Sequence, residues 1–525
     1  MLRRLCLGTG FAVCLLLSNA HAETFRYAFR IDPASLDPQA IAETFTLSWL
    51  GQIYEPLVGR GKELELIPAL AVKWEQPDPL TWRFHLRPNV KFHGGEPFSA
   101  DDVVFSIDRV KMEGSDMAYT VNSVKEVKKV DDLTVDMLLE KPNPILPYQI
   151  TSTYMMSKSW AETNGAGKPA SVKAKLENFA STNTNGTGPF KIKSRQAGVR
   201  TVFEPHPDWW GNGTREHNLT EVIFTPIQAD ATRVAALLSG EVDMVYPVPQ
   251  QDVARVKSGG NFDVLQGSEL RTIFLNMDQK RDELLDSNIK GKNPLKDLRV
   301  RKAIYQAIDI EAIKDRIMGG SSRIAGIMVA PGITGYDAKL DTRYPFDLAT
   351  SKKLLAEAGY PDGFEMGMDC PNDRYVNDEK ICQAIVGMLA RAGIKVNLLA
   401  QTRTKYFEKI LGRNTSFALL GWQPLSYDAH STLQETMHTP VGKSGTYNVG
   451  NYSNPKIDEL TEAVETETDL AKRQAMISEA LSIDKADVGH IPLHQAALAW
   501  GIRKGVSLVQ RADDVLELKW VKVGK

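Results

Sequence analysis

A strand, a helix and a second strand follow one another between residues 364 and 399, and this pattern limits the folds open to the chain most strongly. Phe364–Met368 and Ile394–Leu399 are short apolar runs that predict strands, and Asn377–Ala392 predicts the helix between them. A turn at Pro361–Gly363 precedes the unit. Two strands joined in this way form a right-handed crossover in the same sheet, so the sequence predicts an α/β fold.

Helices and strands alternate elsewhere in the chain as well. Residues 81–92 alternate between apolar and polar side chains and predict a half-buried strand, and Ser99 is placed to open the helix that follows. A helix is predicted from Asp297 to about Gly319–Gly320, and residues 457–483 predict a helix broken near 466–469. The last fifteen residues are expected to contain an alternating strand.

The first 22 residues have the pattern of a cleavable export signal. Arg3 and Arg4 precede the uncharged run Leu5–Leu17, and Ala20–Ala22 fits the small-x-small pattern of a cleavage site. The apolar run is short for a membrane anchor, which needs about 20 residues. A lipid anchor on Cys14 is a further alternative. We expect cleavage after Ala22 and a periplasmic mature protein.

Charge and cysteine content exclude some classes of function. The chain has 63 basic and 65 acidic side chains, so its formal net charge is −2 and no basic surface for nucleic acid or an anionic membrane is expected. Beyond the signal, Cys370 and Cys382 are the only cysteines. In an exported chain two cysteines predict one disulfide, although a free reactive pair or a metal site is an alternative. No nearby cysteine or histidine completes a zinc site.

Motifs of the common enzymes are missing from the sequence. It contains no G-x-S-x-G, no H-E-x-x-H and no phosphate-binding P-loop, and the glycines around Gly211 and Gly213 fail the dinucleotide pattern. The histidines are scattered, with no pair at helical spacing beside an acid. We therefore expect no catalytic residue, no cofactor and no metal, and an exported hydrolase is the least favoured function.

Several segments, in order, resemble the bacterial extracytoplasmic solute-binding proteins of family 5. They are Ser35–Pro38, Tyr54–Val58, Trp82–Val103, Gly188–Phe190 and Arg233–Asp243, and the resemblance covers nearly all of the chain after the signal. Members of this family serve importers of peptides, nickel chelates, opines and related solutes. The resemblance implies a binding protein that delivers a small-molecule ligand to the permease subunits of an ABC importer in the inner membrane. A periplasmic sensor or peptide-binding chaperone on the same fold is the alternative.

The resemblance also implies an α/β, two-lobed periplasmic binding protein fold of the class II type, with an extra domain inserted in the first lobe and a monomeric state. The expected parts are the signal peptide 1–22, the first lobe 23–60, its inserted domain 61–184, the first lobe again 185–270, the second lobe 271–485, and a return to the first lobe over 486–525.

Two segments of the second lobe are candidates for the ligand site, because each follows a predicted strand and ligands of open α/β sheets bind at the carboxyl ends of strands. The predicted ligand-binding residues are Asn372, Arg374, Tyr375, Trp422, Tyr427 and Asp428. Arginine offers a planar fork to a carboxylate or phosphate, and the aromatic residues offer ring faces.

Structural roles are alternatives for three of these residues. Arg374 can cap the following helix or pair with a neighbouring aspartate, Trp422 can belong to the core, and Asp428 can be the N-cap of the helix that follows it. One difference from the family also matters. Peptide-binding members carry an acid three residues after this tryptophan, which receives the amino group of the peptide, and Leu425 stands there instead. This puts the binding of peptides with a free amino terminus in doubt.

Overall fold

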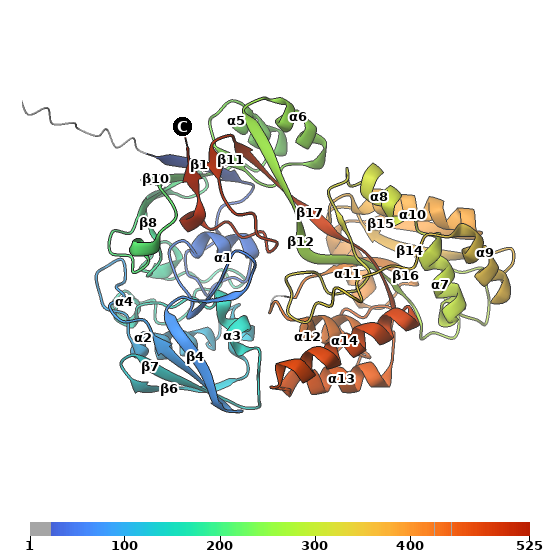
Figure 1. The fold of residues 1–525 in the computed structure, drawn as a ribbon, viewed down its shortest axis with the longest axis horizontal. Helices are drawn as coiled ribbons and strands as arrows, with labels where there is room; N and C mark the ends of the chain where they lie inside the picture. The colour runs from blue at the N-terminus through green and yellow to red at the C-terminus, as the bar shows by residue number, and fades with distance from the viewer. Residues whose placement is uncertain (1–22, 425, 443, 525) are drawn as a thin grey trace, which may run out of the picture.

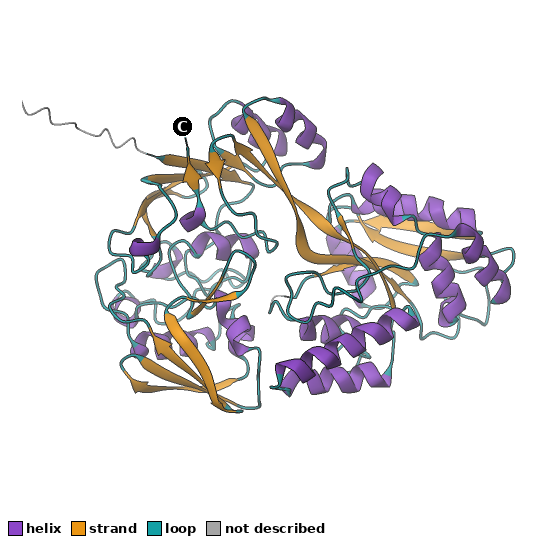
Figure 2. Ribbon diagram, in the orientation of Figure 1, coloured by secondary structure: helices purple, strands orange, loops and turns teal. Residues whose placement is uncertain are grey.

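The computed structural model describes residues 23–424, 426–442 and 444–524, which form two lobes joined by a pair of long strands (Figure 1). The predicted signal peptide, residues 1–22, and Leu425 lie outside the described residues. Figure 2 shows helices gathered around the second lobe and a strand-rich domain at the lower end of the first. In the part of the chain that the structure describes, no helix is both long and apolar enough to cross a membrane.

The connection between the lobes consists of β12 (Phe262–Met277) and β17 (His490–Arg503), which pair antiparallel from Phe262 opposite Arg503 to Asn276 opposite His490. In the first lobe β17 pairs with β11 (Met244–Val245), and in the second lobe β12 pairs with β16 (Phe417–Trp422). One eleven-stranded sheet therefore runs through both lobes. A connection this narrow is where the lobes can rotate relative to each other.

The first lobe is built on β1 (Thr24–Phe29), which pairs in parallel with β10 (Glu221–Pro226) on one side and with β11 on the other. Phe25, Tyr27 and Trp49 are buried in the core beside this sheet. The other elements of this lobe are α1 (Thr44–Leu50), α4 (Lys158–Thr163), β8 (Phe190–Gln196), β9 (Arg200–Pro205), α5 (Asp230–Leu238), α6 (Val253–Ser258) and β18 (Val506–Ser507).

A separate four-stranded sheet with its own core lies at the lower end of the first lobe (Figure 1). Its strands, in sheet order, are β4 (Ala71–Asp78), β5 (Thr81–Leu86), β7 (Thr134–Leu139) and β6 (Val124–Asp131). The predicted strand from residue 81 is thus present but ends at Leu86. The predicted helix is α2 (Ala100–Val110), where Ser99 and Asp102 form a capping box. The nearby short elements are β2 (Val58–Arg60), β3 (Leu66–Pro68) and α3 (Leu146–Gln149).

The second lobe contains the predicted strand–helix–strand unit. It consists of β14 (Phe364–Pro371), α10 (Asp378–Ala392) and β15 (Ile394–Gln401), and the two strands are neighbours that pair in parallel. The prediction is confirmed, with ends shifted by a few residues. The other elements are α7 (Leu298–Ala307), α8 (Ile310–Arg316), β13 (Arg323–Ile324), α9 (Leu348–Glu357), α11 (Arg403–Leu411), α12 (Ala429–Thr432), α13 (Pro455–Thr466) and α14 (Leu470–Asp487).

Two local predictions are wrong. The helix expected from Asp297 to about Gly320 is divided into α7 and α8, because Ile308 takes an extended backbone conformation and Asp309 caps the second helix by accepting the Ala312 N–H. The expected C-terminal strand is reduced to the two-residue β19 (Lys522–Val523). The apolar residues of this segment, Leu516, Leu518 and Val521, pack into the core of the first lobe without pairing with a neighbouring strand. This packing explains the alternating pattern in the sequence.

Candidate functional site

A cavity of about 570 Å³ lies where both lobes meet the connecting strands. We call it the arginine cavity. The first lobe contributes Arg30, Glu43, Thr44 and Tyr246, the connecting strands contribute Glu269, Arg271 and Ala496–Trp500, the second lobe contributes Arg374, Tyr375, Arg403 and Gln423, and the C-terminal segment contributes Asp513 and Asp514. A solute held there touches both lobes, which is the requirement for closing a two-lobed protein around its ligand.

The loop after β14 brings two of the predicted residues, Arg374 and Tyr375, into this cavity. The Asp378 carboxylate holds the loop by accepting the backbone N–H groups of both residues at 2.9 Å. The Tyr375 hydroxyl accepts the Gly421 N–H at 2.9 Å, which ties this loop to the end of β16. Asp378 thus organises the loop through its backbone, and the Arg374 guanidinium stays available in the cavity.

A disulfide fastens the base of the same loop. Cys370 at the end of β14 is joined to Cys382 in α10, with 6.6 Å between the two Cα atoms, and both side chains are fully buried. The strand that precedes Arg374 is thereby attached covalently to the helix behind it.

Positive charge dominates the wall that the second lobe gives to this cavity. The guanidinium of Arg374 lies 4.9 Å from the Tyr375 ring and makes no ion pair within the described residues. Arg271 lies 3.4 Å from Glu269 and donates to Gln423 at 3.3 Å. Burial lowers the pKa of Arg374, and the nearby Arg271 lowers it further. An anionic group placed between these arginines relieves both effects.

Acidic groups also line the arginine cavity. Burial raises the pKa of Glu269 on the connecting strand. Burial also raises the pKa of Asp514 to about 7, although the Trp500 indole N–H donates to this carboxylate at 2.8 Å. The cavity thus has a cationic wall in the second lobe and weakly acidic groups at the connecting strands and the C-terminal segment.

Asp428, predicted to contact the ligand, has a structural role and does not line the arginine cavity. Its side chain is fully buried, and its two oxygens accept from both terminal nitrogens of Arg473 at 2.7 Å. The same carboxylate accepts the His430 N–H at 2.8 Å and so caps α12. A fully buried carboxylate needs such partners, because an unpaired charge is very unfavourable away from water. The structural alternative for Asp428 is the one observed.

Trp422 and Tyr427 were predicted to form one apolar wall of the ligand site. In the structure they line two different cavities. Trp422 packs against Tyr447 with 4.9 Å between the rings, and it lines a cavity of about 470 Å³ between the part of the first lobe that holds the four-stranded sheet and the second lobe. Tyr427 donates to Asp513 at 3.1 Å and lines a third cavity, of about 300 Å³. The Asn372 side chain is exposed and lines none of these three cavities.

Several residues of the arginine cavity were not predicted from the sequence. Arg403 directly follows β15, so the strand-end reasoning that pointed to Arg374 applied to it equally. Glu269 and Arg271 flank Leu270 at the start of an apolar run in β12, and charged residues at that place were a usable signal. Asp513 and Asp514 lie in a C-terminal loop and carried no signal of their own.

Known proteins match the chain over most of its length. The model of the bacterial extracellular solute-binding proteins, family 5 Middle, matches residues 65–444. The dipeptide-binding protein of Escherichia coli strain K12 is 27% identical over 451 residues, which are 79% of each chain. Heme-binding protein A of Haemophilus influenzae is 25% identical over 499 residues, covering 90% of this chain and 86% of its relative.

A solved structure shows the same architecture. The structure of HbpA2 from Haemophilus parasuis superimposes with a TM-score of 0.83 and 25% sequence identity, covering 96% of this chain and 100% of the other. The two-lobed α/β periplasmic binding protein fold and the family resemblance expected from the sequence are therefore confirmed.

Proposed function

Because this chain belongs to the bacterial extracellular solute-binding proteins of family 5, we propose that it captures an anionic organic solute between its lobes and delivers it to an ABC importer. The observation that carries the proposal is Arg374, a half-buried cation without an ionic partner in the described residues, in a cavity bounded by both lobes. The protein acts by binding and release, without chemical change of the solute.

The charge pattern favours a carboxylate or a phosphate as the recognised group. Arg374 and Arg271 present planar donors to the same space, and hydrogen bonds between ionised partners are about twice as strong as neutral ones. Peptide-like, opine-like and conjugated organic acids all carry such a group. A free amino terminus is not required by this cavity, in agreement with Leu425 at the position where peptide-binding members have an acid.

Binding and transport follow from the two-lobed shape. A solute that contacts Arg30 or Tyr246 in the first lobe and Arg374 in the second stabilises the closed arrangement, because only contacts to both lobes distinguish closed from open. Export through residues 1–22, a monomeric mature protein in the periplasm and docking of the closed form on inner-membrane permease subunits complete the proposal.

Acetylated peptides of two to four residues test the proposal, each prepared with a free carboxylate and as the C-terminal amide. Calorimetry should show that the carboxylate form binds the wild type at least about tenfold more tightly, because a charged hydrogen bond contributes about 1.5–3 kcal/mol. Arg374→Ala should remove this preference and leave the melting temperature without ligand unchanged. Arg374→Lys should retain part of it.

Arg391→Ala is the matched control, since this exposed arginine lies in α10 and lines none of the cavities. It should keep the wild-type preference. Equal affinity of the wild type for the carboxylate and the amide forms would refute recognition of an anion.

A further inference from the structure

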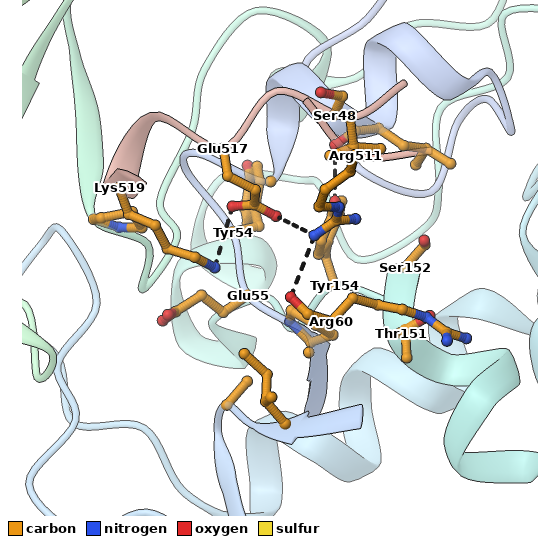
Figure 3. Close-up of a pocket in the computed structure, with 18 of the residues that line it drawn as sticks. Ser48, Tyr54, Glu55, Arg60, Thr151, Ser152, Tyr154, Arg511, Glu517 and Lys519 are labelled. Atoms are coloured by element: carbon orange, nitrogen blue, oxygen red, sulfur yellow. Dashed lines mark hydrogen bonds and ion pairs between the residues drawn. The ribbon is translucent and has the colours of Figure 1, made fainter. Parts of the chain in front are cut away.

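The cavity of about 300 Å³ beside the arginine cavity is lined by several aromatic side chains, of which Tyr54 and Tyr154 are labelled in Figure 3. We call it the aromatic cavity. Most of its walls come from the first lobe and the C-terminal segment, and one comes from the second lobe. The rings that line it are those of Tyr54, Tyr119, Tyr154, Trp209, Trp210, Tyr427 and Trp520.

Both carboxylates at the centre of the aromatic cavity have hydrogen-bonding or ionic partners. The Glu55 carboxylate accepts the indole N–H groups of Trp209 at 3.1 Å and Trp210 at 2.9 Å. Glu517 lies between Lys519 at 3.1 Å and Arg511 at 3.4 Å, as the dashed lines in Figure 3 show. These contacts stabilise both carboxylates, while Arg60 lines the same cavity without an ion pair in the described residues and donates to Thr151 and to backbone carbonyls.

Pairing also fixes the orientation of the rings. The two indoles are held from one side by Glu55, and Trp210 is covered on a face by the Arg87 guanidinium at 3.8 Å. Tyr427 is held between Asp513, which accepts from its hydroxyl, and Arg60, whose guanidinium lies 3.9 Å from the ring centre. Rings held in this way offer flat, apolar faces at little cost in side-chain entropy.

The aromatic cavity adjoins the arginine cavity. Thr44 of the first lobe and Gln423 of the second lobe line both. A solute with its charged end beside Arg374 can therefore extend past Gln423 into the aromatic cavity. There it also meets Tyr427, a second residue of the second lobe. The volume of about 300 Å³ lies at the lower limit for ligand pockets, so it suits one ring system and not a whole solute.

We propose that the aromatic cavity binds an aromatic or similarly planar group of the solute whose anionic group lies in the arginine cavity. The inference rests on the proposed function and narrows it, because the transported solutes are then organic acids that carry a ring. The fixed ring faces select for stacking of a planar group at this end of the solute.

Two matched series of probes test the inference: acetyl-Trp-(Gly)n and acetyl-Ala-(Gly)n with one to three glycines and a free carboxylate. Calorimetry should show that, at the best length, the tryptophan probe binds the wild type at least tenfold more tightly than the alanine probe. Val515→Trp places a large side chain in the aromatic cavity and should abolish this difference while both probes still bind. Ile67→Trp fills it from β3 and serves if the first variant does not fold.

Val199→Trp is the matched control, because Val199 is 51% exposed and lines none of the three cavities. It should keep the wild-type preference for tryptophan. Arg374→Ala should weaken both series alike and keep their ratio. If Arg374→Ala weakens both series but the wild type binds the tryptophan and alanine probes equally, the aromatic cavity does not bind a ring of the solute. The proposed function then stands. If Arg374→Ala changes neither series, or no probe binds the wild type at millimolar concentration, the proposed function fails as well.

Discussion

The loops after β14 and β16 occupy equivalent positions in the sheet, yet their charged residues have opposite roles. Arg374, in the first loop, lies in the arginine cavity without an ionic partner among the described residues. Asp428, in the second, is fully buried and bound at both oxygens by Arg473. Position at the end of a strand brings a charge to the edge of the sheet, and a distant partner decides whether that charge meets a ligand.

The difference between the two loops also lies in how each is held. The loop of Arg374 is fixed by backbone N–H groups that bind Asp378 and by the disulfide at its base, so its guanidinium is not needed to hold the loop. The loop of Asp428 is fixed by that side chain itself, through the Arg473 pair and the cap of α12. Removing each side chain should therefore affect stability and affinity in opposite ways.

Asp428→Asn should have the largest effect, and on stability alone. It leaves the buried Arg473 guanidinium without its counter-ion, which typically costs about 3–5 kcal/mol in the free energy of unfolding. Urea unfolding of the ligand-free protein measures the loss. Asp469→Asn, at the exposed N-cap of α14, should cost little, because asparagine caps a helix about as well as aspartate. A loss for Asp428→Asn no larger than for this control would mean that the Arg473 pair is not structural.

Opening the Cys370–Cys382 disulfide should give the next largest effect. The cysteines are twelve positions apart, and a cross-link of this size stabilises a protein by about 3 kcal/mol in the chain-entropy model. The double variant Cys370→Ala/Cys382→Ala should unfold at lower urea concentration and bind the carboxylate probes several times more weakly, since the Arg374 loop loses its anchor. Thiol counting on the denatured, unreduced wild type should find no free thiol at these positions. Two free thiols would show that the bond does not form.

The smallest expected effect is the pH dependence of binding that Asp514 causes. This residue lines the arginine cavity, as Arg374 does, but its carboxylate has one partner, the Trp500 indole N–H. Burial first, then Glu269 and Asp513, raise its pKa to about 7, whereas the Trp500 donor and Arg30 act in the opposite direction. Its carboxyl therefore gains a proton as the pH falls from 8 to 6, and the cavity loses a negative charge. Affinity for the carboxylate probes should rise over that range, by less than about tenfold because the group is partly exposed.

Asp514→Asn should bind these probes with little dependence on pH between 6 and 8. Asp362→Asn, an exposed acid outside the cavities, should keep the dependence of the wild type. An affinity that falls as the wild type is acidified would contradict the assignment of this titration to Asp514.

Periodicity and turn residues were sufficient for the elements of the second lobe that pack locally. The unit β14–α10–β15 was predicted to within a few residues, because its strands and helix are neighbours in sequence and each buries a regular apolar face. The break between α7 and α8 was missed because the apolar spacing continues across Ile308, which takes an extended backbone conformation, and Asp309, which caps the second helix.

The candidate site was predicted only in part, for a different reason. Strand-end position found Arg374 and Tyr375, and the same reasoning applied to Arg403. Strand-end position could not show that Trp422 and Tyr427 line different cavities. The segments that divide the space around the loop after β16, namely the four-stranded sheet of the first lobe and the C-terminal segment, are far from it in sequence.

The sequence by itself determined the α/β class, the family and the segments that carry the site, because these depend on local periodicity and on an ordered set of motifs. Only the tertiary structure decided which charges are free. Arg473 lies 45 positions after Asp428, and no local pattern shows that the two meet as a buried pair. Asp514 lies 140 positions after Arg374, and no local pattern shows that both border the arginine cavity. The energy of a charge depends on its solvent exposure and on the charges near it in space, and both are set by how distant segments pack.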